Sequence, residues 1–326
     1  MEATVVGNFP RVGDSLEQQR LRRAIDAWQQ GKVDIQEVIK FENELTVEAI
    51  NEQINAGISL ITDGQIRWVE PLTWIAGKLK GIKITGLIRL FDNNVYYRQP
   101  VIEGPVGWQE PILVKDFEFA QKTAAGRAQV KAVLPAPYTL ARLSKNNHYK
   151  SLQELVMDMA KAIKQEAEAL VKAGATFIQF DDPSLPYNPE DFAMAAKALE
   201  MVTSGLGQTK TAVYTYFTSV NKIFPNVQKL PVHILGLDLV SDTGNLKLLK
   251  DNKFEKDLAI GIIDGRNTKL ENENDLKTVL KSLDKNQEKI KYVNPSSGLE
   301  FLPRDVAIKK LKLTGALARQ MQAVTH

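Results

Sequence analysis

The sequence predicts a TIM (β/α)8 barrel of the α/β class, with a β-hairpin inserted after the second strand. Short runs rich in Val and Ile alternate with longer segments of helical periodicity, the order expected for βα units. Eight such runs can be counted, and they are apolar enough for parallel strands buried on both faces. The 326 residues suit one barrel. A doubly wound sheet is the alternative.

Each expected strand is a short apolar run that leads into a polar segment. Because the connecting segments carry helical patterns, the strands are expected to run parallel. The eight runs are residues 4–9, 58–63, 129–135, 176–181, 211–217, 234–240, 258–264 and 290–294.

Start and stop signals delimit the expected helices. Ser15 and Ser151 each begin a capping box of the S-x-x-Q or S-x-x-E type. Gly174 suits the left-handed residue that ends a helix. Asn188, which is followed by proline, and Asn272 are expected N-caps.

Two regions interrupt the alternation. The region of about 15–57 is expected to hold two helices. The β-rich region of about 82–115 reads as a hairpin with its turn at 92–94, and it is the insert after the second strand. We find no internal repeat, so residues 1–326 are expected to form one domain that carries this insert.

Composition excludes several classes of function. With 44% hydrophobic residues, 25% charged residues and a net charge of +3, the chain fits a soluble globular protein without a nucleic-acid surface. No apolar run is long enough to span a membrane and no signal peptide is evident, so a cytoplasmic location is expected. The absence of cysteine excludes disulfides, a thiol nucleophile and thiolate metal ligands.

Polar residues recur at the predicted carboxyl ends of the strands, where TIM barrels place their active sites. The same end of nearly every strand is marked, which a purely structural framework would not require. These residues include Asn8, Arg11, Gln65, Asp181, Asp182, Tyr214, Tyr216, Asp238, Asp242, Arg266, Asn267, Ser296 and Ser297.

The most specific of these strand ends is Asp181-Asp182-Pro183. Proline forces the chain out of the sheet after two adjacent acids. Neighbouring residues of a strand point to opposite sides, so at most one acid faces the barrel mouth. The acids are expected to hold a substrate amine or amide, and an N-cap for the next helix is the alternative.

Several established site patterns are missing. No histidine pair has metal-ligand spacing, and H-E-x-x-H does not occur. The nucleophile elbow G-x-S-x-G, a P-loop and a strand-linked G-x-G-x-x-G are also absent.

Four motifs together resemble the cobalamin-independent methionine synthase family, in its C-terminal catalytic barrel or short "core" form. They are VGNFPR at 6–11, ITDGQIR at 61–67, QFDDPSL at 179–185 and VNPSSGL at 293–299. In contrast, DGRN at 264–267 resembles the zinc-free N-terminal half of the long synthases.

The resemblance implies a barrel that binds homocysteine on zinc and receives a methyl group from a folate or corrinoid donor. The positions where the family carries zinc ligands fall on Ala212, Tyr214, Asp238 and Ser297 in this chain. Serine and tyrosine hydroxyls are poor zinc ligands compared with thiolate and imidazole. The chain is therefore expected to bind no metal there.

We therefore expect a methyltransferase that moves a methyl group between a methyltetrahydrofolate-type pterin and a corrinoid (cobalamin) acceptor, either free or held on a corrinoid protein. A methionine synthase with unconventional metal use and a non-catalytic pterin-binding relative are the alternatives. Glu70 falls where the family has a substrate-amine glutamate, with a surface acid as its alternative role. The expected catalytic residues are Asp181, Arg266 and Asp238, and the expected substrate-binding residues are Asn8, Arg11, Glu70, Asp182, Tyr214, Asn267 and Ser297.

Overall fold

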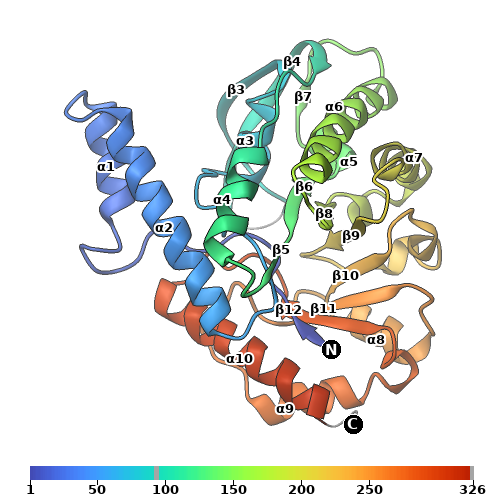
Figure 1. The fold of residues 1–326 in the computed structure, drawn as a ribbon. Coiled ribbons are helices and arrows are strands. Elements are labelled where there is room, and N and C mark those ends of the chain that lie inside the picture. The colour runs from blue at the N-terminus through green and yellow to red at the C-terminus, as the bar shows by residue number, and fades with distance from the viewer. Residues whose placement is uncertain (92–94, 324–326) are drawn as a thin grey trace.

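The computed structural model describes residues 1–91 and 95–323. Its parallel strands pair in a ring (Figure 1), with the order β1-β12-β11-β10-β9-β8-β6 along the main sheet. The ring closes because Thr4, next to β1, bridges to Leu60 in β2, while β2 pairs with β5, which leads into β6. The predicted α/β fold with a curled parallel sheet is confirmed.

The strands of the ring are short, and all except β1 lie within the predicted apolar runs or extend one residue beyond them. The first predicted strand, 4–9, was misplaced: β1 covers Glu2–Ala3, pairing ends at Thr4, and the amide of Phe9 donates to the carbonyl of Gly64 (2.9 Å). The strands are β1 Glu2–Ala3, β2 Leu60–Ile61, β5 Gln129–Val130, β6 Ala132–Pro135, β8 Phe177–Asp181, β9 Lys210–Thr215, β10 Ile234–Asp238, β11 Asp257–Ile263 and β12 Ile290–Pro295.

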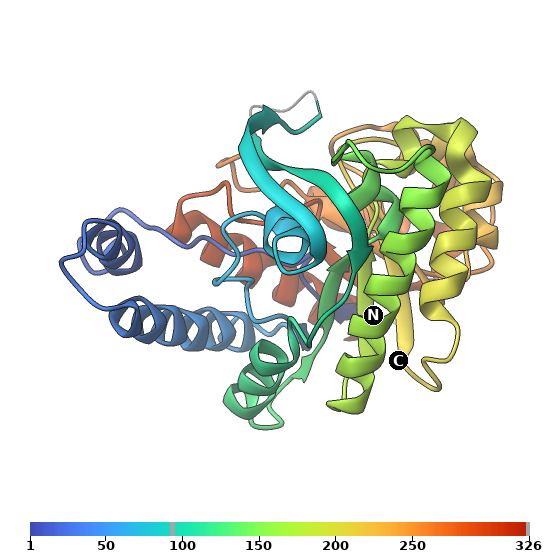
Figure 2. The ribbon, with the colours of Figure 1, turned by 90° about the horizontal axis from the view of Figure 1, so that it is seen from above.

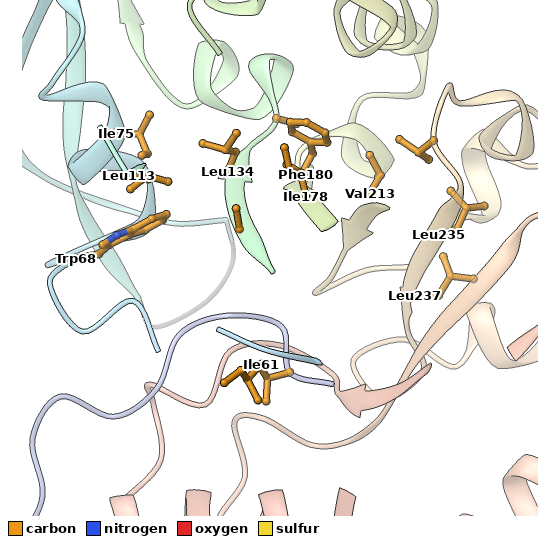
Figure 3. Close-up of a cluster of buried hydrophobic side chains, with 14 of the residues drawn as sticks. Ile61, Trp68, Ile75, Leu113, Leu134, Ile178, Phe180, Val213, Leu235 and Leu237 are labelled. Carbon is orange, nitrogen blue, oxygen red and sulfur yellow. The ribbon is translucent and has the colours of Figure 1, made fainter. Parts of the chain in front are cut away.

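Side chains alternate between the barrel interior and the layer under the helices, as the two-residue period of a strand requires. In β8, Ile178 and Phe180 belong to the main core, which Figure 3 shows together with Val213. Phe177 belongs to a separate cluster of alternate strand residues that fills the barrel interior. Asp181 has the parity of Phe177 and therefore points into the barrel.

The helices surround this ring, and α10 packs on β1 and β12. The predicted pair of helices in 15–57 is confirmed as α1 and α2, which extend from the barrel as an arm in Figures 1 and 2. The helices are α1 Arg20–Gln29, α2 Ile35–Asn55, α3 Pro71–Ala76, α4 Val114–Ala124, α5 Pro137–Arg142, α6 Leu152–Lys172, α7 Phe192–Thr203, α8 Gly244–Asp251, α9 Glu273–Lys281 and α10 Arg304–Ala323. None of the described helices is long and apolar enough to cross a membrane.

Three of the predicted helix signals are present. The Ser151 hydroxyl accepts a hydrogen bond from the amide of Glu154 (3.2 Å) at the start of α6. Gly174, just past the end of α6, has a left-handed φ of +93°. The Asn272 side chain accepts from the amide of Asn274 (2.8 Å) and caps α9.

Two other signals are placed differently. Ser15 and Gln18 do exchange reciprocal hydrogen bonds, but they close a turn that precedes α1, which begins at Arg20. Asn188 precedes the short 3-10 turn Pro189–Asp191, and its side chain donates to the carbonyl of Ser184 instead of capping α7. The capping box at Ser15 is therefore formed but precedes its helix, whereas the predicted N-cap role of Asn188 was wrong because its side chain donates to Ser184.

Replacing Ser151 with alanine is expected to lower the free energy of unfolding by about 1 kcal/mol, because the Glu154 amide loses its capping acceptor. Urea unfolding followed by circular dichroism measures the change. Ser282 is the control, since its hydroxyl only donates to the carbonyl of Val279 at the end of α9. A loss at Ser151 no larger than that at Ser282 contradicts the capping assignment.

The inserted hairpin consists of β3 Lys80–Arg89 and β4 Tyr96–Gly107, paired antiparallel. The predicted turn at 92–94 lies outside the described residues. β4 also pairs in parallel with β7, Lys145–Asn146, which follows α5. The hairpin is therefore attached beside the third βα unit of the barrel, and residues 80–107 are its extent, compared with the predicted 82–115.

Glu166 of α6 fixes the segment that returns from the hairpin to α4. Its side chain is fully buried and accepts hydrogen bonds from the indole of Trp108 (2.7 Å) and from the amides of Ile112 and Leu113 (2.8 Å each). A buried carboxylate with three donors is satisfied and holds its neighbours in one arrangement.

Candidate active site

A cavity of about 160 Å³ opens where the strands of the barrel end. Its lining comes from segments far apart in the sequence: the ends of β6 and β8, the loop after β2, the hairpin, and the segment after β12. Aromatic and aliphatic side chains dominate this lining. The residues used below are Asn8, Arg11, Trp68, Glu70, Tyr96, Asp181, Tyr216, Phe217, Glu300 and Phe301.

Asp181 is the charged group at the inner end of this cavity, and only 8% of the residue is exposed. One carboxylate oxygen accepts a hydrogen bond from the side chain of Gln179 (2.7 Å), and the other lies 3.4 Å from the hydroxyl of Tyr216. Burial raises the pKa of the carboxyl to about 7, although Gln179 and a nearby lysine favour its charged form. Asp181 is thus suited to hold a cationic or N–H group of a substrate.

Lys131 is the nearby lysine, and no sequence pattern marked it as part of a site. It is 2% exposed and lies between β5 and β6. Its ammonium donates to the carbonyl of Val5 and to the side-chain oxygen of Gln179 (2.6 Å), and it lies 4.9 Å from the ring centre of Tyr214. Because Lys131 takes the oxygen of Gln179, the amide NH2 must face Asp181. Burial lowers the pKa of Lys131 to about 7.

Asp182 points away from the cavity, as strand alternation predicts. It is buried, and the hydroxyl of Thr139 donates to it (2.5 Å). Burial raises the pKa of its carboxyl to about 7. The same Thr139 hydroxyl accepts from the amide of Ser184 (3.1 Å), so Asp182 braces the turn that follows β8.

Glu300 is a second lining carboxyl that was not predicted from the sequence. It follows the VNPSSGL motif by one residue, where no pattern marks it as functional. Burial, followed by the charge of Asp181, raises the pKa of Glu300 to about 7. The cavity therefore contains two acids that titrate near neutral pH.

Aromatic rings from both sides meet at the mouth. Phe91, two residues after β3, stacks on Tyr187 with 4.8 Å between ring centres and contacts Phe217 edge-on at 6.2 Å. The guanidinium of Arg266 lies 5.0 Å from the ring centre of Phe217 and donates to the hydroxyl of Ser241 (2.9 Å). Arg266 thus supports a lining residue without lining the cavity itself.

Glu70 lines the cavity and also holds the hairpin. Its carboxylate accepts from the backbone amide of Arg98 (2.6 Å), from the Arg98 guanidinium (2.7 Å) and from the hydroxyl of Thr73 (2.5 Å). The predicted amine-binding role of Glu70 therefore competes with this attachment.

Asn8 and Arg11 both line the cavity, as expected for substrate-binding residues. The Asn8 carbonyl accepts from the amide of Leu299 (2.9 Å), which leaves its side chain for the cavity. Arg11 donates through Nε to the carbonyl of Ile66 (2.7 Å), and burial lowers the pKa of its guanidinium. Arg11 is thus a fixed positive charge beside the cavity.

Four other predicted site residues do not line the cavity. The Asp238 carboxylate accepts from three backbone amides, those of Phe217, Val240 and Ser241 (2.9 Å each). Asn267 is exposed and accepts from the amide of Lys269 (2.9 Å). Asp238 and Asn267 thus stabilise loops. The remaining two are Tyr214 and Ser297, both buried.

The side chains at the positions where the resemblance places zinc ligands do not fit zinc. Ala212 has no donor atom, and the Asp238 oxygens already take three amide hydrogens. The buried Tyr214 hydroxyl has no hydrogen-bond partner among the described residues, and the Ser297 hydroxyl donates to the carbonyl of Gly298 (3.3 Å). Within the described part of the chain, no group of three or more His, Cys, Asp or Glu side chains could hold a metal ion. Zinc requires such N, S or carboxylate donors.

The chain is similar to known methionine synthases over nearly all of its length. A family model described as "Cobalamin-independent synthase, N-terminal domain" matches residues 76–291. A methionine synthase of Saccharolobus solfataricus is 31% identical over 316 residues, covering 95% of this chain and 92% of that protein. One of Sulfurisphaera tokodaii is 31% identical over 313 residues, covering 95% and 89%.

Solved structures share the fold. The B12-independent methionine synthase of Shewanella sp. W3-18-1, in complex with selenomethionine, has a TM-score of 0.83 at 22% identity, covering 99% of this chain and 98% of that one. A putative vitamin-B12-independent methionine synthase of Listeria monocytogenes has a TM-score of 0.77 at 16% identity, covering 98% and 99%. The matching family model is that of the N-terminal domain, which the stretch 264–267 also resembles, although the other motifs resemble the C-terminal barrel.

Proposed function

This chain belongs to the cobalamin-independent methionine synthase family and is a methyltransferase of that family, and from this premise we propose that it methylates the thiol of homocysteine to form methionine. The observation that carries the proposal is the buried Asp181 at the inner end of an aromatic cavity, at the carboxyl ends of the barrel strands. An amino acid with its ammonium on this carboxylate would place its side chain among apolar walls.

The comparisons support this choice over transfer between folate and a corrinoid, the main expectation from the sequence. Relatives that match 95% of this chain are named methionine synthase, and a solved relative of the same fold binds selenomethionine. Both point to an amino acid with a sulfur or selenium side chain as a ligand of this kind of site.

Different lining residues bind different parts of the two proposed substrates. Asp181 holds the ammonium of the acceptor, and Arg11 supplies positive charge for its carboxylate. Trp68, Tyr96 and Phe301 offer apolar and aromatic surface for the flat ring of a methyl-folate donor. Closing these groups around the reactants excludes water and fixes the sulfur near the methyl carbon.

Folate-to-corrinoid transfer is kept as a second candidate because of one observation: the residues at the family's zinc positions do not fit zinc. A thiol near neutral pH is mostly protonated, with a pKa of about 8.5, and without the metal another group must take its proton. A reduced corrinoid is nucleophilic without such help.

Purified protein supplied with homocysteine and either methyltetrahydrofolate or methylcobalamin is expected to form methionine, measured by mass spectrometry, with and without added zinc. A parallel reaction replaces homocysteine by reduced cobalamin and follows the methylcobalamin spectrum. Methylcobalamin formation without any methionine would favour the second candidate. If neither methionine nor methylcobalamin forms and titration shows no pterin binding, both candidate activities are excluded and the protein is a non-catalytic member of the family.

A further inference from the structure

Glu300 is placed to react with a ligand in the cavity. It lies directly after the chain has left β12 and lines the same cavity as Asp181. Within residues 1–91 and 95–323, one of its carboxyl oxygens is buried and has no hydrogen-bond partner. A buried carboxylate oxygen without a donor is costly, so such an atom points to a missing hydrogen that a ligand would supply.

The local sequence makes room for this placement. The Glu300 carboxyl folds back over Gly298, and a Cβ at position 298 would overlap that carboxyl. Gly298 does not have a left-handed φ. Glycine at 298 therefore leaves space for the Glu300 carboxyl, and a larger residue would push this flexible side chain aside without straining the backbone.

The other lining acids already have hydrogen-bonding partners within the protein. Among the described residues, the lining carboxyls are those of Glu70, Asp181 and Glu300. Glu70 accepts three hydrogen bonds from Arg98 and Thr73. Asp181 accepts from Gln179 and lies against the Tyr216 hydroxyl. Of these three carboxyls, Glu300 is the one with a buried oxygen that accepts no hydrogen bond within the described residues.

We propose that Glu300 is a further catalytic residue, the group that accepts the proton of the acceptor thiol. The inference rests on the proposed function. The S–H bond breaks, its proton goes to the free carboxylate oxygen of Glu300, and the sulfur electron pair forms a bond to the methyl carbon. The bond between that carbon and the donor breaks, and its electron pair leaves with the donor.

The charges around Glu300 suit this step. The titratable groups facing it are Asp181 from β8 and Tyr216, which follows β9. Burial and Asp181 together raise the pKa of Glu300 to about 7, closer to that of a thiol than an exposed glutamate would be. Proton transfer from a thiol with a pKa of about 8.5 is then less uphill than transfer to an exposed glutamate would be.

The test uses Glu300→Gln, with Asp305→Asn, an exposed acid on α10, as control. At pH 7 the Gln variant is expected to lose about 100-fold or more in kcat/KM for homocysteine, the usual range for loss of a general base. The wild-type rise of kcat/KM around pH 7 should move toward the free thiol pKa of about 8.5 in the variant. Asp305→Asn should match the wild type.

Selenohomocysteine separates a catalytic role from a structural one. Its selenol is far more acidic than a thiol and needs no base, so the loss in Glu300→Gln should shrink to less than about tenfold. An equal loss for thiol and selenol would overturn the proposal, as would an unchanged pH profile. Gly298→Ala, which displaces the carboxyl without removing it, should show the same selective loss for the thiol.

The outcomes also distinguish the inference from the proposed function. A wild-type protein that forms no methionine from any donor defeats the proposed function, and the inference falls with it. If the wild type forms methionine and the Glu300→Gln variant is equally active, the proposed function stands and only the inference about Glu300 is wrong. If the Gln variant does not fold, Gly298→Ala takes its place in the comparison of thiol and selenol, because its glycine needs no left-handed conformation.

Discussion

Replacing Asp181 with asparagine is expected to lower kcat/KM for methyl transfer by about 100- to 1,000-fold. The carboxylate is buried at the inner end of the cavity, and removing one partner of a buried charge pair costs about 2–5 kcal/mol. Since the proposed partner is the substrate ammonium, the loss should appear mainly as a higher KM. Steady-state kinetics with homocysteine measures it.

Asp182→Asn is the matched control, since Asp182 is the neighbouring acid, is also buried, and does not line the cavity. An asparagine oxygen can still accept from Thr139, so we expect less than a fivefold change, on the order of one hydrogen bond to a neutral acceptor. Equal losses for the two variants would show that the pair acts through the fold rather than through substrate contact.

Stability should move in the opposite direction at Asp181. The pKa of its carboxyl is 3.8 when unperturbed and about 7 in the folded protein, so the folded state binds more protons between these values. Wild-type stability from this group therefore falls as pH rises from about 4 to 7. Asparagine does not titrate, so Asp181→Asn should gain stability relative to wild type over that window, which urea unfolding at pH 5 and pH 8 tests.

Replacing Glu166 with alanine is expected to lower the free energy of unfolding by about 3–5 kcal/mol. The substitution leaves the Trp108 indole and the amides of Ile112 and Leu113 without a hydrogen-bond acceptor, because all three donate to this fully buried carboxylate. Urea unfolding followed by circular dichroism at constant m-value measures the change.

Glu168→Ala on the same helix is its control. Glu168 is exposed and forms a salt bridge with Lys164 one turn away (3.1 Å), a contact worth about 0.5 kcal/mol or less. A Glu166 variant that unfolds like the Glu168 variant would mean that the segment after the hairpin contributes little to the stability of the barrel.

The sequence predicted the barrel well because parallel strands need continuous apolar runs and because turn residues separate them. Its errors are local. Residues 5–9 are as apolar as a strand, yet Phe9 bonds to Gly64 outside the sheet. Ser15 forms its capping hydrogen bonds in a turn before α1. Propensity reports which bonds a residue prefers, whereas tertiary packing decides where the helix begins.

The candidate site was predictable only in part. The Asp181 end of β8 and the lining residues Asn8 and Arg11 followed from strand ends. Asp238, like Asp181, is the last residue of an apolar strand, but backbone amides donate to its carboxylate, and no pattern in one sequence reports that. Lys131 was missed because a lysine inside an apolar strand normally suggests an exposed edge. Glu300 was missed because it lies one residue after the VNPSSGL motif, where no pattern marks it as functional.

The double use of Glu70 has a consequence for the cavity as a whole. Its carboxylate lines the cavity and at the same time ties the hairpin to the barrel through Arg98. A ligand that recruits Glu70 must take it from Arg98, so occupancy of the cavity and attachment of the hairpin are thermodynamically linked. Such linkage is reciprocal: whatever holds the hairpin in place weakens the binding of any ligand that needs Glu70, and by the same free energy.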